Sequence, residues 1–143
     1  MNDAERIQTL RTRSGRTASE MAQLSGMAHM EYFDLEFHDD ELKSVPSLAA
    51  VKRLASALGV PTRRLFVDEP DSPSGRHVSY DALVALVRRR VAADGSQEPL
   101  EDEIGWYLDD FLAGEAAAMA AYPVEFLIAL CERLAVDWLD ALP

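Results

Sequence analysis

The side chains that could do chemistry gather most densely in the first third of the sequence. They are two histidines, the second of which is followed directly by three acids: His29, His38, Asp39, Asp40 and Glu41. Imidazole and carboxylate groups bind zinc and other transition metals, but the spacing here matches no known ligand pattern. Histidines beside acids are more often solvated surface residues than ligands, so we expect neither a metal ion nor another cofactor.

The other reactive groups also favour structural roles. The acids Glu101, Asp102 and Glu103 are typical of the first turn of a helix, where carboxylates interact favourably with the helix dipole. The single cysteine, Cys131, lies at helical spacing among leucines, as a small core residue would. The sequence contains neither a glycine-rich phosphate loop nor a Ser-His-Asp arrangement. We therefore predict that this protein is not an enzyme.

The charge composition argues against a typical nucleic-acid-binding protein. The 143 residues include 14 Lys and Arg against 25 Asp and Glu, which gives a formal net charge of −11. Basic and acidic residues number 9 and 12 up to Gly75, and 5 and 13 after it. Neither half therefore offers phosphates an overall basic surface. The chain is 48% hydrophobic and has no export signal or membrane-spanning run of ~18 apolar residues. We expect a globular, cytoplasmic protein.

Signals for five helices follow one another from Ile7 to Phe66. Thr17-Ala18-Ser19-Glu20 has the form of a capping box, which begins the second helix. Gly26 permits a tight turn between this helix and the third. The other expected boundaries are the end of helix one at Ser14-Gly15, the start of helix four at Ser44 or Ser47, its end at Gly59, and a short fifth helix from Pro61-Thr62 to Leu65-Phe66.

Composition divides the chain into residues 1–67, a linker at 68–78, and a second helical domain at 79–143. The linker is rich in Pro, Ser, Gly and acid. In the second domain, Leu130 to Asp137 matches Leu54 to Pro61, which suggests a degenerate duplicate of the first half. No counterpart of helix three is recognisable there, and Gly114 to Ala118 is a plain Ala-rich stretch.

The second half has more aromatic surface than a domain of this size needs to stand alone. The residues concerned are Trp106, Phe111, Phe126 and Trp138. We expect the two halves to pack on each other as one body. The alternative is that this surface pairs two chains in a homodimer.

A set of residues in the first half carries a family resemblance. In order, they are Leu10-Arg11, Gly15, Met21-Ala22, Gly26, Leu35-Glu36, Pro46-Ser47, Leu54-Ala55, Leu58-Gly59-Val60 and Leu65-Phe66. Over about residues 5–67 the chain resembles the Cro/C1-type, or XRE-like, helix-turn-helix family. The resemblance implies an all-α fold that begins with a lambda-repressor-like helix-turn-helix bundle. It also implies a structural ion pair between Arg11 and Glu36, which would hold the recognition helix to the scaffold.

The recognition helix departs from the family pattern, so this chain resembles a variant with an acidic recognition helix. Family members usually expose Ser, Arg, Thr, Gln or Lys on this helix and offer Gly, Arg or Lys in the loop that follows. Here the helix carries Glu31, Phe33 and Asp34, and the loop carries Asp39 to Glu41. Two acids and a phenylalanine are poorly suited to reading base edges.

Two functions are compatible with these observations. The favoured one is binding of a basic protein partner, as immunity proteins and antitoxins do, through an acidic face formed by His29, Glu31, Tyr32, Phe33, Asp34, Asp39, Asp40 and Glu41. The alternative is a sequence-specific, DNA-binding transcriptional regulator, in which Arg13, Arg16 and Lys43 would contact the phosphates of duplex DNA.

Overall fold

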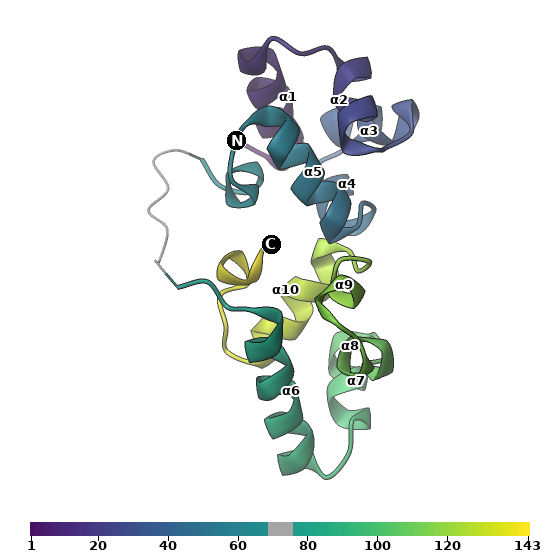
Figure 1. The fold of residues 1–143 in the computed structure, drawn as a ribbon, viewed down its shortest axis with the longest axis vertical. Coiled ribbons are helices and arrows are strands. Elements are labelled where there is room, and N and C mark those ends of the chain that lie inside the picture. Colours follow the sequence, from purple (N-terminus) through teal and green to yellow (C-terminus); the bar gives the residue numbers. More distant parts are fainter. Residues whose placement is uncertain (69–75) are drawn as a thin grey trace. The chain divides into compact units, whose positions relative to one another are not determined.

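A computed structural model describes residues 1–68 and 76–143, and its regular structure there consists of helices without a strand (Figure 1). The all-α prediction is therefore confirmed at the level of fold class. The chain divides between Ser72 and Pro73 into two compact units, with Pro143 grouped with the first. The predicted linker at 68–78 lies mostly outside the described residues. No helix within the described ranges combines the length and apolar character needed to cross a membrane.

Unit 1 begins and ends its helices largely where the sequence predicts. Thr17 and Glu20 form the expected capping box, and Gly15, Gly26 and Gly59 adopt left-handed backbone conformations at helix ends. Of the two serines considered for the fourth predicted helix, Ser47 is the cap. The elements are α1 (Asp3–Ser14), α2 (Ala18–Ser25), α3 (His29–Phe37), α4 (Glu41–Ser44), α5 (Leu48–Leu58) and η1 (Thr62–Leu65).

One element of unit 1 differs from the prediction. The acidic segment after helix three was expected to be a loop, but Glu41 begins the single helical turn α4. Leu42, on this turn, is fully buried. Burial of the Leu42 side chain in the core stabilises this turn. Local sequence signals alone do not predict such a tertiary contact.

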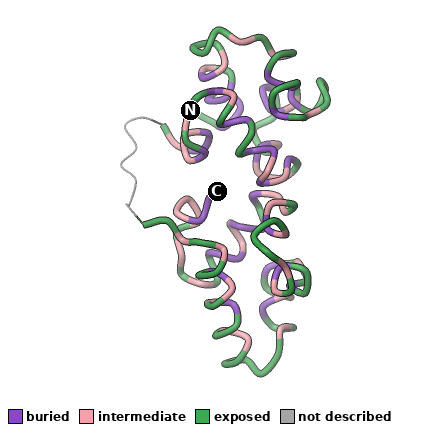
Figure 2. Tube along the Cα trace, viewed as in Figure 1, coloured by how far each residue is buried: buried purple, intermediate pink, exposed green. Residues whose placement is uncertain are grey.

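The core of unit 1 lies where α3 packs on α1 and α2, and α2 packs on α5. Figure 2 shows buried residues along the inner sides of these helices. The fully or almost fully buried side chains include Ile7, Met21, Tyr32, Leu35, Leu48, Val51, Leu54 and Leu65. Their removal from water supplies the main driving force for this unit.

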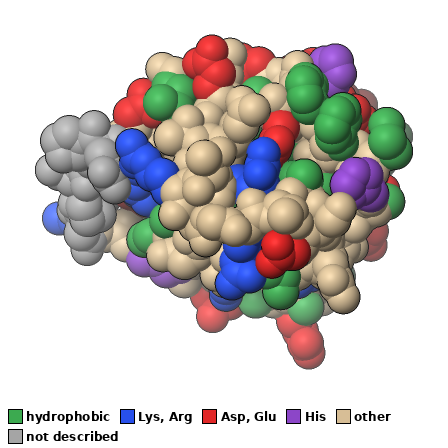
Figure 3. Space-filling model, turned by 90° about the horizontal axis from the view of Figure 1, so that it is seen from above, with side chains coloured by type: hydrophobic (Ala, Val, Ile, Leu, Met, Phe, Trp, Pro, Cys, Tyr) green, Lys and Arg blue, Asp and Glu red, His purple; other side chains and the backbone are tan. Residues whose placement is uncertain are grey.

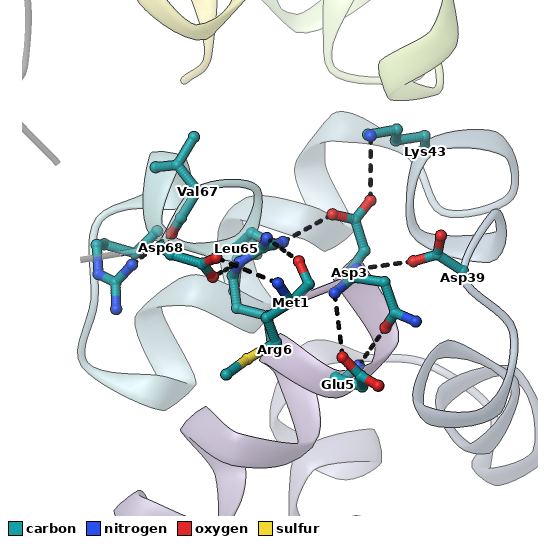
Figure 4. Close-up of polar contacts among 11 residues, drawn as sticks. Met1, Asp3, Glu5, Arg6, Asp39, Lys43, Leu65, Val67 and Asp68 are labelled. Atoms are coloured by element: carbon teal, nitrogen blue, oxygen red, sulfur yellow. Dashed lines mark hydrogen bonds and ion pairs between the residues drawn. The ribbon is translucent and has the colours of Figure 1, made fainter. Parts of the chain in front are cut away.

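A polar network joins the first turn of α1 to the end of unit 1 (Figure 4). The buried Arg6 guanidinium donates hydrogen bonds to Asp68 at 2.9 Å, to Asp3 at 2.8 Å and to the Leu65 carbonyl at 3.1 Å. The contact with Arg6 lowers the pKa of Asp68. A buried charge is tolerated only when it is paired and hydrogen-bonded in this way, so the network ties both ends of unit 1 together.

Unit 2 has a core of its own. Phe126 lies at its centre, with its ring centroid 5.6 Å from Phe111, 5.7 Å from Trp106 and 4.0 Å from Tyr122. Three of the four aromatic residues that we assigned to an interface between halves or chains therefore pack against each other inside this unit. Its elements are α6 (Tyr80–Asp94), α7 (Glu98–Ile104), α8 (Asp109–Ala113), α9 (Ala116–Met119), α10 (Val124–Arg133) and η2 (Trp138–Ala141).

The described elements of both units follow the same order. In each, a long helix is followed by two shorter ones, a single turn, a second long helix and a 3-10 turn. Ala135 follows α10 with a φ of 55°, where Gly59 follows α5 with a φ of 71°. By this order the counterpart of α3 is α8. The Ala-rich stretch at Gly114 to Ala118 instead supplies the first three residues of the single turn α9.

Candidate functional site

The inner face of α3 is held by a hydrogen-bonded clamp. Arg11 donates from Nε and Nη2 to the two carboxylate oxygens of Glu36, and the Tyr32 hydroxyl donates to Glu36 Oε1 at 2.8 Å. This is the pair between Arg11 and Glu36 that the family resemblance implies. Burial, followed by the hydrogen bond with Glu36, raises the pKa of Tyr32. The hydrogen bond with Glu36 also raises the pKa of Arg11. The clamp therefore fixes which side of α3 faces the core.

The outer face of α3 carries large hydrophobic side chains in solvent. Met30, Phe33 and Phe37 are 64%, 40% and 59% exposed. The Phe33 and Phe37 rings stack with centroids 4.4 Å apart, and His29 stacks on Phe33 at 6.4 Å. We call these four residues the α3 patch. Figure 3 shows hydrophobic side chains gathered beside histidines on the side where α3 lies.

Acidic side chains border the α3 patch. Asp34 stands one helical turn from both Met30 and Phe37, and Glu31 stands one turn from Asp34. Neither acid forms an ion pair with a described residue. Asp39, Asp40 and Glu41 follow the helix after its C-cap residue His38, and the first two are exposed. We call these five acids the acidic rim.

Two members of the predicted acidic face have other positions or roles. Tyr32 is fully buried, so its predicted place on the partner-binding face is wrong. Its hydroxyl turns inward because Glu36 lies four residues further along the same face. Asp39 accepts the backbone N–H of Asp3 at 2.7 Å, so one of its oxygens already caps the start of α1.

The patch also contains two residues that the predicted face did not include. Met30 and Phe37 are both exposed. Together with Phe33 they occupy positions i, i+3 and i+7, which share one side of a helix. That spacing indicates a shared side of the helix, but it does not tell whether this side is buried or exposed.

The candidate phosphate-binding residues of unit 1 differ in how far they are engaged by the rest of the protein. Arg13 is exposed on α1. Arg16 donates from Nε to the Ala57 carbonyl at 3.0 Å, and Lys43 lies 3.3 Å from Asp3 Oδ2. Two of the three are therefore already engaged within the protein.

The acids at positions 101–103 belong to the framework of unit 2. Their helix, α7, begins at Glu98, so only Glu101 falls in its first turn. Glu101 accepts the Leu108 N–H at 2.7 Å, and Glu103 pairs with Arg90 at 3.1 Å. Cys131 is buried, as predicted, and its burial raises its pKa to about 12. Among the described residues, no three His, Cys, Asp or Glu side chains are grouped so as to hold a metal ion.

Comparisons with known proteins found no match from which a role of the α3 patch could be inferred. No family model, no curated protein and no solved structure matches this chain. The family resemblance of the first half therefore depends on its own residues.

Proposed function

We propose that this protein is a non-catalytic regulatory protein that binds a basic protein partner through the α3 patch and the acidic rim. In this proposal α2 and α3, joined through Gly26, are the helix-turn-helix of a Cro/C1-like fold. The protein would bind its partner in the way that an immunity protein or an antitoxin binds its target. The observation that carries the proposal is the stacked and exposed pair Phe33 and Phe37.

Exposed phenylalanines on a rigid helix suit a binding interface. Interface hot spots are enriched in aromatic side chains, which a polar rim surrounds and shields from water. The clamp of Arg11, Glu36 and Tyr32 holds α3 from behind, so Phe33 and Phe37 are presented on a fixed backbone. A partner that covers them therefore loses little free energy to ordering of this helix.

The charge of the surface favours a basic partner. Glu31 and Asp34 form no ion pair with a described residue, and the whole chain has a formal net charge of −11. Complementary charge accelerates association and disfavours acidic competitors. The same charges oppose DNA, whose duplex carries one negative charge per ~1.7 Å. The regulator alternative also loses support because Lys43 pairs with Asp3 inside the protein.

Site-specific cross-linking tests this proposal. Phe33 is replaced by the photoreactive p-benzoylphenylalanine, and the protein is irradiated in cells of its source organism. We expect a discrete adduct with a protein of positive net charge. The matched control carries the same group at Ala85, which is exposed on α6 and should give no such adduct.

Charge reversal separates protein binding from DNA binding. The double variant Glu31→Lys and Asp34→Lys should lose the adduct and remain folded, because both side chains lie outside the core. In parallel, the unmodified protein is incubated with sheared genomic DNA at low salt. Recovery of a discrete, repeatable DNA fragment, with no protein adduct at position 33, would contradict the proposal and favour the regulator.

A further inference from the structure

A hollow between α2 and α5 gathers basic side chains in this acidic protein. It has a volume of about 450 Å³ and is lined by Arg16, Leu24, Lys52, Arg53, Ser56 and Ala57. Only 14 residues of the chain are Lys or Arg, yet three of them converge here. We call it the α2–α5 hollow. It shares no residue with the α3 patch, so the observations that suggest its role are separate from those for the protein partner.

Both arginines of the hollow are held in place by the main chain. Arg53 donates from Nε to the Ser25 carbonyl at 2.9 Å, and Arg16 donates from Nε to the Ala57 carbonyl at 3.0 Å. The terminal amino groups of Arg53 have no hydrogen-bond partner among the described residues. Arg16 has one loose ion pair, 3.9 Å from Glu20. The two guanidinium groups are therefore positioned in advance with donors to spare, which favours an oxyanion.

The rest of the hollow adds donors and an apolar wall. Lys52 and Ser56 are exposed on α5 and supply an ammonium and a hydroxyl group. Leu24 is 48% exposed and, with Ala57, forms the apolar part of the lining. A group with several strong acceptor oxygens can use all of these donors, and a phosphate group has them.

We propose that the α2–α5 hollow binds the phosphate group of a small molecule. Its volume falls in the range of small-ligand sites, roughly 300–1,000 Å³. A nucleic acid instead needs a basic stripe or face that follows its backbone, and both halves of this chain are acidic overall. The ligand is either inorganic phosphate or a phosphate monoester. The apolar part of a monoester would contact Leu24 and Ala57.

The test is an NMR titration of the full chain with inorganic phosphate and with phenyl phosphate at constant ionic strength. We expect saturable shifts of the lining residues, with a Kd of the order of 1 mM. Lys52→Gln should raise the Kd about tenfold, because it removes one charge-assisted contact. The charge-matched control Arg13→Gln lies outside the hollow and should change the Kd by less than about twofold.

The two ligands distinguish the source of the phosphate group. Tighter binding of phenyl phosphate assigns the site to a monoester, and equal binding assigns it to free phosphate. Lys52→Gln is the deciding variant because Arg53 also holds the end of α2 through Ser25. The proposal is overturned if neither ligand saturates, or if Lys52→Gln and Arg13→Gln have the same effect. Displacement of phenyl phosphate by a lower concentration of duplex DNA would also overturn it.

Discussion

Single hydrogen bonds decide the orientation of α3. Tyr32 is fully buried, and its hydroxyl donates to a Glu36 carboxylate that also accepts from Arg11. A buried carboxylate needs all of these donors, because an unpaired buried charge is strongly destabilising. The exposed positions of the α3 patch thus depend on three polar residues on the inner side of the helix, Arg11, Tyr32 and Glu36.

Removal of the Tyr32 hydroxyl should therefore weaken unit 1. Tyr32→Phe keeps the ring but deletes a hydrogen bond to a charged acceptor. We expect the free energy of unfolding to fall by about 1.5–3 kcal/mol, measured by urea denaturation followed by circular dichroism. The same substitution at Tyr107, which is 83% exposed, should change it by less than about 0.5 kcal/mol. Equal effects at the two positions would show that the hydroxyl of Tyr32 does not hold the helix.

The elements of both units obey the same local rules of helix termination. The residue after α5 is Gly59, and the Val60 N–H then donates to the Ala55 carbonyl at 3.1 Å. After α10 the equivalent bond joins the Val136 N–H to the Cys131 carbonyl at 3.0 Å, but the left-handed residue is Ala135. The segments Leu54–Pro61 and Leu130–Asp137, which match in sequence, therefore end their helices with the same hydrogen bond. That unit 2 is a degenerate duplicate of unit 1 stays a prediction.

The alanine at this helix end should be a strained position. A side chain at positive φ costs roughly 1–2 kcal/mol, so Ala135→Gly should stabilise unit 2 by about 1 kcal/mol. Both tryptophans, Trp106 and Trp138, belong to this unit, and their fluorescence during urea unfolding measures the change. Ala85→Gly, in the middle of α6, should instead lower stability by about 0.5–1 kcal/mol. A loss of stability in both variants would rule out strain at Ala135.

At the scale of the whole molecule, the dominant property is the surplus of acid. A formal net charge of −11 opposes compaction by self-repulsion, while ion pairs such as that of Arg6 with Asp68 oppose unfolding. Salt screens both effects over a Debye length of about 10 Å at 0.1 M. Salt screens the buried Arg6 network less than it screens the exposed acids. The repulsion between the acids should therefore respond to salt more strongly than the stabilising ion pairs do.

Moderate salt should therefore stabilise the protein. We expect the melting temperature to rise by about 2–5 °C when NaCl is raised to about 0.15 M, as followed by circular dichroism. A variant with Glu125→Gln and Glu132→Gln, both exposed on α10, should melt higher at low salt and show a smaller rise. A fall in melting temperature with salt would mean that ion pairs outweigh the repulsion.

Local sequence signals are enough to predict where most of the helices of unit 1 begin and end. Thr17, Ser47, Gly26 and Gly59 act on backbone groups within a few residues of themselves, so their effects can be read locally. The burial of Cys131 was predictable from its leucine neighbours for the same reason. The turn α4 was not, because it depends on where Leu42 finds the core.

Which faces of the helices stay exposed depends instead on how the helices pack. Apolar residues lie on both sides of α3, and its spacing alone did not tell whether Tyr32 or Phe33 would be buried. Packing on α1 and α2, together with the Arg11 clamp, selects Tyr32. The α2–α5 hollow likewise brings together Arg16 and Arg53, which are far apart in the sequence. The packing of α2 on α5 creates this surface, and residue spacing along the chain does not reveal that packing.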